Sequence, residues 1–328
     1  FFAAALNYST LVRYSHVVVG LLIMGSFIAL AVGAWYLKKN RHIDFAMKTV
    51  RVATVCAIVT TGVMLVTAHS SAVTVAEEQP TKLAMMEGAY ETESMPLYAF
   101  GWVDEETQQV ITPFSIPGGT SFLATGDFSA EYQGLNDLAE SGVYGDAFTA
   151  ETVENLPVNA VFQSYHLMVA MFGLIALTTI LALIFTYRGG RIKNMKWLQW
   201  LCIISPLFPF FAIQGGWFTA EVGRQPWVVY PAESSPAGVS LEVGDAYSQS
   251  VTGPEVALTI VLFVVVYLFL IIGWARIVAH QIKKGPEMSA SEAQLMGFDA
   301  SATKAVAAAG VAGGGAAAGT TIAVKDGE

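Results

Sequence analysis

A carboxylate, a guanidinium and two indole rings lie close together in the sequence, directly after a long apolar run. They belong to the string Gly215-Gly216-Trp217-Phe218-Thr219-Ala220-Glu221-Val222-Gly223-Arg224-Gln225-Pro226-Trp227. Charge beside a bilayer core is costly and is usually kept for function. Glu221 could ligate a metal or carry protons, and Arg224 could clamp a carboxylate with its planar side chain. Trp, Arg and a helix-ending Pro also form ordinary interfacial anchors, but anchoring does not require this order.

Two other side chains inside apolar stretches could hold a cofactor. His16 could ligate haem, relay protons or form an interhelical hydrogen bond. Met168 taken alone indicates packing, although His with Met is a known axial pair for haem iron. His166 is the rival ligand. Residues two apart on a helix point about 200° apart, so His166 and Met168 cannot both ligate one iron without distortion.

Lys82 and Glu87 stand in a long polar stretch between two apolar runs. The segment Thr81–Glu91 predicts a short amphipathic helix. Residues five apart are not ideal helix neighbours, so a simple salt bridge is the weaker interpretation. A carboxylate can accept a proton from a bound substrate, and an ammonium can hydrogen-bond a substrate oxygen. The rest of the stretch, about Phe100–Glu154, is acidic and is typical of a small outer domain or a mobile lid.

Composition predicts an all-α integral membrane protein. Hydrophobic residues make up 54% of the 328 residues and charged residues 13%, whereas soluble domains have about 45–50% and about 25%. Spanning a bilayer takes roughly 20 mostly apolar residues. Five stretches meet this requirement and predict a bundle of about five transmembrane helices: Leu11–Leu37, Lys48–Ala68, Val158–Tyr187, Trp197–Ala220 and Pro254–Ala279.

Basic residues predict the orientation of the bundle. They cluster in the connections that fall on one side if the five stretches alternate: Lys38, Lys39, Arg41, His42; Arg188, Arg191, Lys193, Lys196; and Lys283, Lys284. We place that side in the cytoplasm of a prokaryotic cell. The acidic stretch Ser70–Pro157, whose only Lys or Arg is Lys82, then lies outside. His16, Met168 and Glu221 all fall at the outer face.

The chain divides into four parts on this interpretation. Residues 1–69 form two membrane helices, 70–157 an outer loop, and 158–285 three further helices with the Glu221 motif. Residues 286–328 form a flexible Ala/Gly-rich tail. The net charge of −9 largely reflects the acidic loops, so it does not indicate a nucleic-acid partner.

The motifs together resemble subunit I of the cytochrome bd-type quinol oxidases. The string around Glu221 carries most of this resemblance. Thr81–Glu87, Phe162–Met168 and His16 add to it in the same order, so the likeness covers about His16 to Lys284. It implies a subunit that oxidises quinol at the outer face. Electrons would then pass through haems b to haem d, where oxygen is reduced to water.

The resemblance also implies residue roles. His16 and Met168 would ligate the low-spin haem b iron, and Glu221 would stand at the high-spin haem b iron. Lys82 and Glu87 would belong to the quinol-binding loop. Arg224 would pair with a haem propionate. His166 would contact a haem propionate, and the family usually has another basic residue at this position. Trp217 would either lie between haems or belong to the interfacial belt.

Two expected components lie elsewhere. The family's subunit has further helices before the equivalent of His16, including a haem ligand and part of the proton path. This chain opens Phe1-Phe2-Ala3. We therefore expect that N-terminal part, and the ligand of haem d with it, on another polypeptide or in a part of the protein outside this sequence. A second membrane subunit, subunit II, is the other expected partner.

Two rival functions remain open from the residues. In a transporter or channel subunit, His16 and Glu221 would be proton or substrate sites, and Pro206, Pro209 and the Gly215–Gly216 pair would break the fourth helix. A structural membrane subunit without cofactor is the third possibility. Cys56 and Cys202 each lie in an apolar stretch, where a free cysteine behaves as a small apolar residue. We find no Walker loop, dinucleotide fingerprint or hydrolase triad in the sequence.

Overall fold

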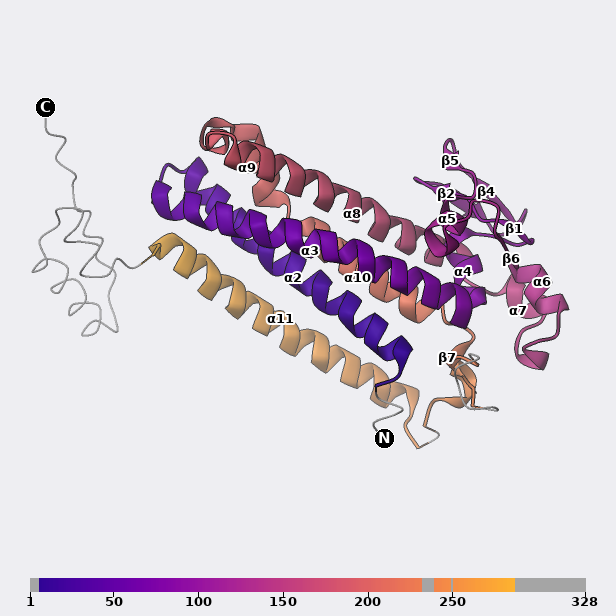
Figure 1. Cartoon of the computed structure of the whole chain (residues 1–328). Coiled ribbons are helices and arrows are strands. Elements are labelled where there is room, and N and C mark those ends of the chain that lie inside the picture. Colours follow the sequence, from indigo (N-terminus) through magenta and orange to yellow (C-terminus); the bar gives the residue numbers. More distant parts are fainter. Residues whose placement is uncertain (1–5, 232–238, 249, 287–328) are drawn as a thin grey trace, which may run out of the picture. The chain divides into compact units, whose positions relative to one another are not determined.

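The computed structural model describes residues 6–231, 239–248 and 250–286, and the expected Ala/Gly-rich tail lies outside the described residues. Five spans in the described residues are long and apolar enough to cross a membrane, which confirms the all-α membrane fold class (Figure 1). The helices of these spans are α2 Tyr8–Lys38, α3 Ile43–Glu78, α8 Val158–Tyr187, α9 Lys196–Ile204 with α10 Leu207–Val222, and α11 Gly253–Lys284.

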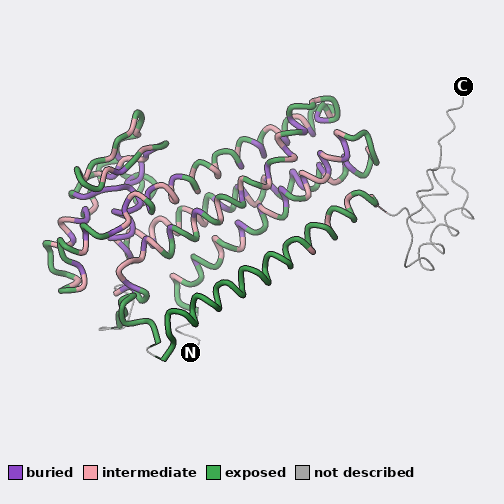
Figure 2. The backbone as a smooth tube through the Cα atoms, turned by 180° about the vertical axis from the view of Figure 1, so that it is seen from behind, coloured by how far each residue is buried: buried purple, intermediate pink, exposed green. Residues whose placement is uncertain are grey.

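Helices α2, α3, α8 and α10 share an apolar core. Val19, Ile23 and Phe27 of α2 pack with residues of the other three helices. A side chain at Gly33 would place its Cβ 2.7 Å from Cγ2 of Val50, so the glycine lets α2 and α3 approach closely. Buried positions follow the faces where these helices meet, and the remaining faces are exposed (Figure 2). Because many exposed side chains are apolar, these outer faces suit contact with lipid or other helices.

Helix α3 is longer than its apolar stretch. The sequence predicts an end near Ala68, but the helix continues to Glu78. No Gly or Pro occurs between Val63 and Gln79, so nothing interrupts the backbone hydrogen bonds. Pro80 then occupies the first turn of α4, Pro80–Glu87, where its missing N–H is not needed. The second span therefore projects beyond the expected membrane boundary, directly into α4.

The fourth span is two helices rather than one. Helix α9 ends at Ile204 and α10 begins at Leu207. Pro206 lacks the N–H that a continuous helix requires, and the Ser205 hydroxyl donates to the Cys202 carbonyl at 2.8 Å. The fourth apolar stretch, expected at Trp197–Ala220, is confirmed as a candidate span over Lys196–Val222, and the span contains this break.

Residues 79–157 form a folded unit that we call the loop domain. It has its own core, built around Met85, Leu135 and Phe148 and joined by Phe162 and Trp227. Its helices are α4, α5 Gly119–Thr125, α6 Leu135–Glu140, the short η1 Gly145–Ala147, and α7 Ala150–Glu154. Its antiparallel strand pairs are β1 Glu93–Ser94 with β6 Glu131–Tyr132, β2 Leu97–Tyr98 with β5 Ser115–Ile116, and β3 Trp102–Asp104 with β4 Gln109–Ile111. This core favours a small folded domain over the mobile lid.

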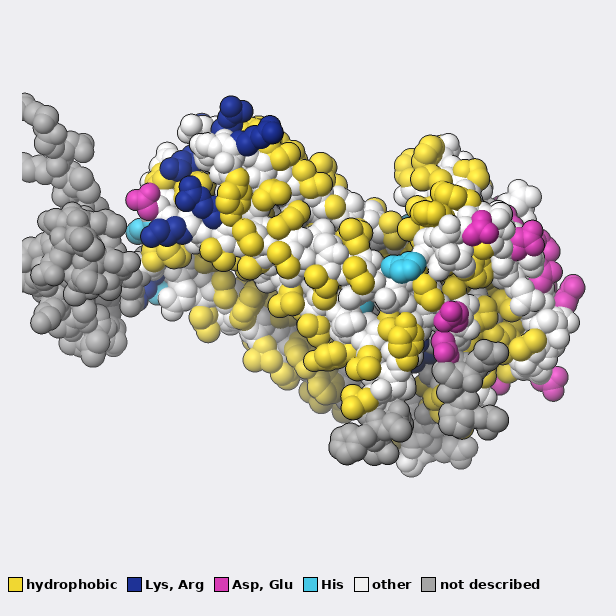
Figure 3. Space-filling model, in the orientation of Figure 1, with side chains coloured by type: hydrophobic (Ala, Val, Ile, Leu, Met, Phe, Trp, Pro, Cys, Tyr) yellow, Lys and Arg dark blue, Asp and Glu magenta, His cyan; other side chains and the backbone are white. Residues whose placement is uncertain are grey.

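Charge is distributed unevenly along the bundle. On the face shown in Figure 3, Lys and Arg side chains gather at the end remote from the loop domain, and Asp and Glu side chains gather over the loop domain. Helices α2 and α8 begin at the loop-domain end, and α10 ends there (Figure 1). The separation of charge is that expected when the basic end faces the cytoplasm.

Candidate functional site

The Glu221 motif is a junction where α10 meets α8. A Cβ at Gly215 would lie 2.7 Å from the carbonyl oxygen of Ser164, and a Cβ at Gly216 would lie 2.9 Å from Sδ of Met168. Thr219 adds a hydroxyl contact of 2.8 Å to the Ser164 hydroxyl. The glycine pair therefore has a packing reason, because any side chain would push the two helices apart or displace Met168.

Lys82 of α4 is buried against the end of α10. Its Nζ donates a hydrogen bond to the carbonyl of Ala220 at 3.0 Å, and its stem lies where a Cβ at Gly223 would come within 3.1 Å of Cγ. Burial, together with the nearby cations Arg13 and Arg224, lowers the pKa of Lys82 to about 7, and Glu221 opposes this shift. Lys82 thus belongs to the same junction as the motif, which lies 138 residues away in sequence.

Glu87, at the other end of α4, is 1% exposed. Both of its carboxyl oxygens lack a hydrogen-bond partner of good geometry. Burial raises the pKa of Glu87 to about 8, and the nearby hydroxyls of Thr120 and Tyr165 oppose this shift. A buried carboxyl without partners is costly and needs an explanation. Its raised pKa lies in the range useful for proton transfer near neutral pH.

Helix α4 departs from the amphipathic helix that we predicted. Every residue from Thr81 to Glu87 is buried, and the helix ends at Gly88 in the left-handed conformation rather than at Glu91. Lys82 and Glu87 do not pair with each other, as their spacing suggested. The loop domain covers the α4 face that sequence periodicity assigned to solvent.

Charged groups gather at the end of α10. Glu221 and Arg224 form an ion pair, with half of the Glu221 side chain exposed. Arg13 interacts electrostatically with Glu78, Glu221 and Arg224. Sequence reasoning missed Arg13. The available signal was a charge within the first apolar stretch, three residues before His16, which is a position where charge indicates function.

His16 and Met168 each present a donor atom that suits haem iron. Nδ1 of His16 is buried without a hydrogen-bond partner, while the ring interacts with the backbone of Thr67. Sδ of Met168 lies against Gly216 on α10. Helix α2 packs on α10 as well, because Gly20 lies close to Ile213. Met168 therefore lies against α10, and His16 lies on a helix that also packs on α10.

His166 lies away from Met168, as the helical spacing predicts. Its ring is stacked on Phe162, with centroids 4.0 Å apart, and Nδ1 is 2.8 Å from the Phe162 carbonyl oxygen. Its Nε2 is buried without a partner. His166 thus packs toward Tyr98 of the loop domain, and Met168 packs toward α10.

The donor set fits haem better than a bare metal ion. Among the described residues, no group of three His, Cys, Asp or Glu side chains could hold a metal ion. Single donors on separate helices are what axial ligation of a porphyrin iron requires. Trp217 is 63% exposed on α10, which agrees with either of its expected roles.

A chain of hydroxyls fixes α4 to the segment after the motif. Tyr230 donates to the Tyr144 hydroxyl at 3.0 Å, which leaves Thr81 as the donor to Tyr230 at 2.9 Å. Trp227 is 2% exposed and stacks on Phe148. The second indole of the motif is therefore a core residue of the loop domain rather than an interfacial anchor.

We expect Tyr230→Phe to loosen α4. It removes both hydrogen bonds and leaves the buried Thr81 hydroxyl unsatisfied, at a cost of about 1–3 kcal/mol. Amide hydrogen exchange of α4 should rise correspondingly. Tyr247→Phe is the control, because Tyr247 is 71% exposed. Unchanged amide hydrogen exchange of α4 in both variants would show that the Tyr230 hydrogen bonds do not hold α4 in place.

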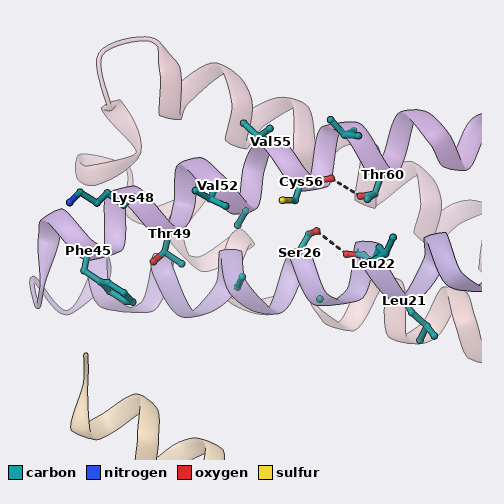
Figure 4. Close-up of a pocket in the computed structure, with 14 residues that line it drawn as sticks. Leu21, Leu22, Ser26, Phe45, Lys48, Thr49, Val52, Val55, Cys56 and Thr60 are labelled. Atoms are coloured by element: carbon teal, nitrogen blue, oxygen red, sulfur yellow. Dashed lines mark hydrogen bonds between the residues drawn. The ribbon is translucent and has the colours of Figure 1, made fainter. Parts of the chain in front are cut away.

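An open apolar groove of about 850 Å³ lies elsewhere, between α2 and α3 (Figure 4). Leu21, Leu22 and Ser26 line it from α2, and Val52, Cys56 and Thr60 line it from α3. None of the candidate residues lines this groove, so it is separate from the candidate site.

Known proteins share this architecture. The family described as "Cytochrome bd terminal oxidase subunit I" matches residues 1–286. The chain is 28% identical over 280 residues to "Cytochrome bd ubiquinol oxidase subunit 1" of Bacillus subtilis, covering 84% of this chain and 57% of the relative. It is 25% identical over 336 residues to "Cytochrome bd-II ubiquinol oxidase subunit 1" of Escherichia coli, covering 86% and 63%.

A solved structure has the same fold. The bd oxidase from Geobacillus thermodenitrificans superposes with a TM-score of 0.68 at 24% identity, covering 87% of this chain and 60% of that chain. The chain thus spans about three fifths of the length of the relatives it matches. With the family match extending from the first residue through the last apolar helix, the chain is a multi-pass membrane protein that belongs to the cytochrome bd terminal oxidase subunit I family.

Proposed function

We propose that this chain carries the quinol-oxidising, haem-binding part of a bd-type terminal oxidase. The observation that carries the proposal is the convergence of two kinds of group at one end of the bundle. Buried Lys82 and Glu87 lie in α4, and Lys82 bonds directly to the motif that contains Glu221. Of the donors suited to haem iron, Met168 lies against Gly216 of the same motif, and His16 lies on α2, which packs on α10.

Glu87 has the properties of the base that quinol oxidation needs. Quinol loses two protons with its two electrons, and a carboxyl with a pKa of about 8 can accept one proton and release it again near neutral pH. Lys82 has its ammonium on the Ala220 carbonyl, and from there it would orient a quinol oxygen. Quinol is therefore proposed to bind beside α4.

The haems would supply the electron-transfer chemistry, with low-spin haem b first, then high-spin haem b, and haem d reducing oxygen to water. His16 and Met168 would hold the low-spin haem iron, Glu221 the high-spin haem iron, and Arg224 and His166 the propionates. In the structure Arg224 forms an ion pair with Glu221. Nε2 of His166 has no partner, and it would donate to a propionate in the imidazolium form, because Nδ1 already donates to the Phe162 carbonyl oxygen.

The proposed orientation of the chain in the membrane follows from the uneven distribution of its charged residues. The acidic loop domain would lie outside the cytoplasmic membrane of a prokaryote, so that quinol protons are released on the outer side. Subunit II and the further N-terminal helices that the family resemblance implies would complete the enzyme, including the haem d ligand. Quinol, oxygen and membrane lipid are the remaining expected partners.

The break between α9 and α10 at Pro206 favours a transporter as a second candidate. A visible absorption spectrum of the purified, assembled complex separates the two functions. We expect reduced-haem bands after dithionite addition. Their absence from an intact complex would exclude the oxidase and leave the transporter.

Gly216→Ala tests the packing of Met168. The added methyl group would come within 2.9 Å of Sδ, so we expect the thioether to move and the low-spin haem absorption to decrease or shift. Gly173→Ala is the matched control, because a Cβ there meets nothing within 4 Å. Equal spectra for both variants would show that Met168 does not depend on this contact.

A further inference from the structure

The loop domain bears a set of large apolar side chains that its core does not use, and we call this set the apolar patch. Its members come from the strands, their connections and α5, and each is at least 43% exposed: Phe100, Trp102, Phe114, Ile116, Phe122 and Leu123. Hydrophobic side chains gather in Figure 3 on the part of the loop domain where Figure 1 places β2 and β5. Contiguous apolar surface of this kind marks a contact with a membrane or another protein.

Most of the apolar patch falls in a segment without charge. Residues 107–126 include no Asp, Glu, Lys, Arg or His, although the loop domain as a whole is acidic. Acidic residues flank the segment on both sides: Asp104, Glu105 and Glu106 before it, and Asp127 after it. The patch therefore offers nothing to a partner that is recognised by charge, and its binding would depend on burial of apolar surface.

A hydrogen bond to α3 fixes the height of α5 along the bundle. Nδ1 of His69 donates to the carbonyl oxygen of Leu123 at 2.8 Å. His69 directly follows the apolar stretch of α3, which ends at Ala68 and is long enough to cross the hydrocarbon layer. Helix α5 is therefore held at the level where the second span leaves the membrane.

Hydrogen bonds to α8 fix the strands at a similar height. Nε2 of Gln163 donates to the carbonyl oxygen of Gly101 at 2.7 Å, and Oδ1 of Asn159 accepts from the Val103 amide at 3.0 Å. Gln163 lies one helical turn before residues 167–187 of α8, a run without any charged residue that is also long enough to span the hydrocarbon layer. Phe100 and Trp102, the two neighbours of Gly101, are thus at the same boundary as α5.

One face of α3 leads directly to the anchor at His69. Residues three, four or seven apart share a helix face. Counting back from His69 by these intervals reaches four exposed valines, namely Val66, Val59, Val55 and Val52. They lie within the span, where an exposed apolar face suits lipid or another helix. The apolar patch continues this face at its outer end.

We propose that the apolar patch rests on the bilayer, with its side chains in the interfacial layer of the leaflet nearest the loop domain. Tryptophan is favoured at this depth, and a helix can bury an apolar face there without spanning the membrane. The hydrogen bonds to α3 and α8 hold the patch at the required height. The inference goes beyond the proposed function, because it does not depend on which reaction the bundle carries out.

Lipid is favoured over a protein as the occupant for two reasons. Both anchors lie at the ends of membrane-spanning apolar runs, and the central segment of the patch has no charge for a partner to pair with. The rival occupant is a protein, such as the portion of the longer relatives that this chain does not span.

The test is the accessibility of a nitroxide spin label in the assembled complex, held in phosphatidylcholine nanodiscs. The label is attached at Phe114→Cys or Leu123→Cys in a Cys56→Ser background, since Cys56 is the exposed native cysteine and Cys202 is buried. Oxygen concentrates in lipid and a nickel chelate stays in water. We expect the ratio of oxygen to nickel accessibility to be several-fold higher at both positions than at the control.

Val143→Cys is the matched control. Val143 is also an exposed apolar residue of the loop domain, at 72%, but it lies between Glu140 and Asp146 and outside the patch. Nickel accessibility at positions 114 and 123 equal to that at 143 would place the patch in water and overturn the proposal. Protection from both reagents would overturn it too and show that a protein covers the patch. Haem bands bear only on the proposed function, so the two proposals fail separately.

Discussion

Glu87→Gln should abolish most quinol oxidation while leaving the cofactors in place. The amide keeps the size of the side chain but cannot accept a proton, and loss of a general base typically costs about 10²–10⁴-fold in rate. We therefore expect the quinol-dependent kcat to fall by about 100-fold or more. Quinol-dependent oxygen consumption measures this fall, and the dithionite-reduced spectrum should be unchanged because Glu87 is not an iron ligand.

The pH profile of the wild-type complex provides a second check on Glu87. Since burial raises the pKa of this carboxyl to about 8, the carboxylate fraction falls about tenfold for each pH unit below that value. The kcat/KM for quinol should rise with pH from 6 and level off above 8. Glu140→Gln, which alters an exposed acid of the loop domain, should keep both the rate and the profile. A Glu87→Gln complex with normal turnover would show that the base lies elsewhere.

Met168→Leu should remove the low-spin haem signature. Leucine fills a similar volume but has no sulfur to offer, so the iron would lose an axial ligand and become high-spin. Optical spectra and paramagnetic resonance of the purified complex measure the change. We expect the low-spin signal to disappear completely.

A nearby methionine controls for packing. Met171 lies three residues further along α8 and is also partly buried. Met171→Leu should leave the low-spin signal intact, since Met171 is not expected to ligate iron. If Met168→Leu also retained an unaltered low-spin spectrum, the ligand would have to be another residue, with His166 and its unpartnered Nε2 as the first alternative.

The apolar runs in the sequence were sufficient to locate the membrane helices but not to locate their ends. Apolar runs located all five spans, because a membrane helix must be apolar for roughly 20 residues. They gave the wrong end for α3, whose polar last turns from His69 to Glu78 are helical because no residue interrupts them. They also missed the break before α10, although Pro206 was visible as a possible helix breaker.

Site residues were recognisable where their chemistry was unusual for their surroundings. His16 and Glu221 stand out as polar groups at membrane stretches. The contact between Lys82 and the motif does not, because it joins residues 138 positions apart, and only the packing of α4 against the end of α10 brings them together.

The burial of α4 could likewise not be predicted from the sequence. The segment from Thr81 to Glu87 mixes polar and apolar residues, which favours one solvent-facing side. The loop domain and the segment around Tyr230 cover that side instead. Burial is the property that shifts the pKa values of Lys82 and Glu87 toward neutrality, so the chemistry of the site depends on a tertiary contact.

Anaerobic mixing of the purified wild-type complex with quinol tests the central claim most directly. If quinol delivers electrons at α4 to a haem held by His16 and Met168, the low-spin haem bands should appear as reduced within the time of one turnover, before any other haem changes. A complex whose haems are reduced by dithionite but not by quinol would contradict the account.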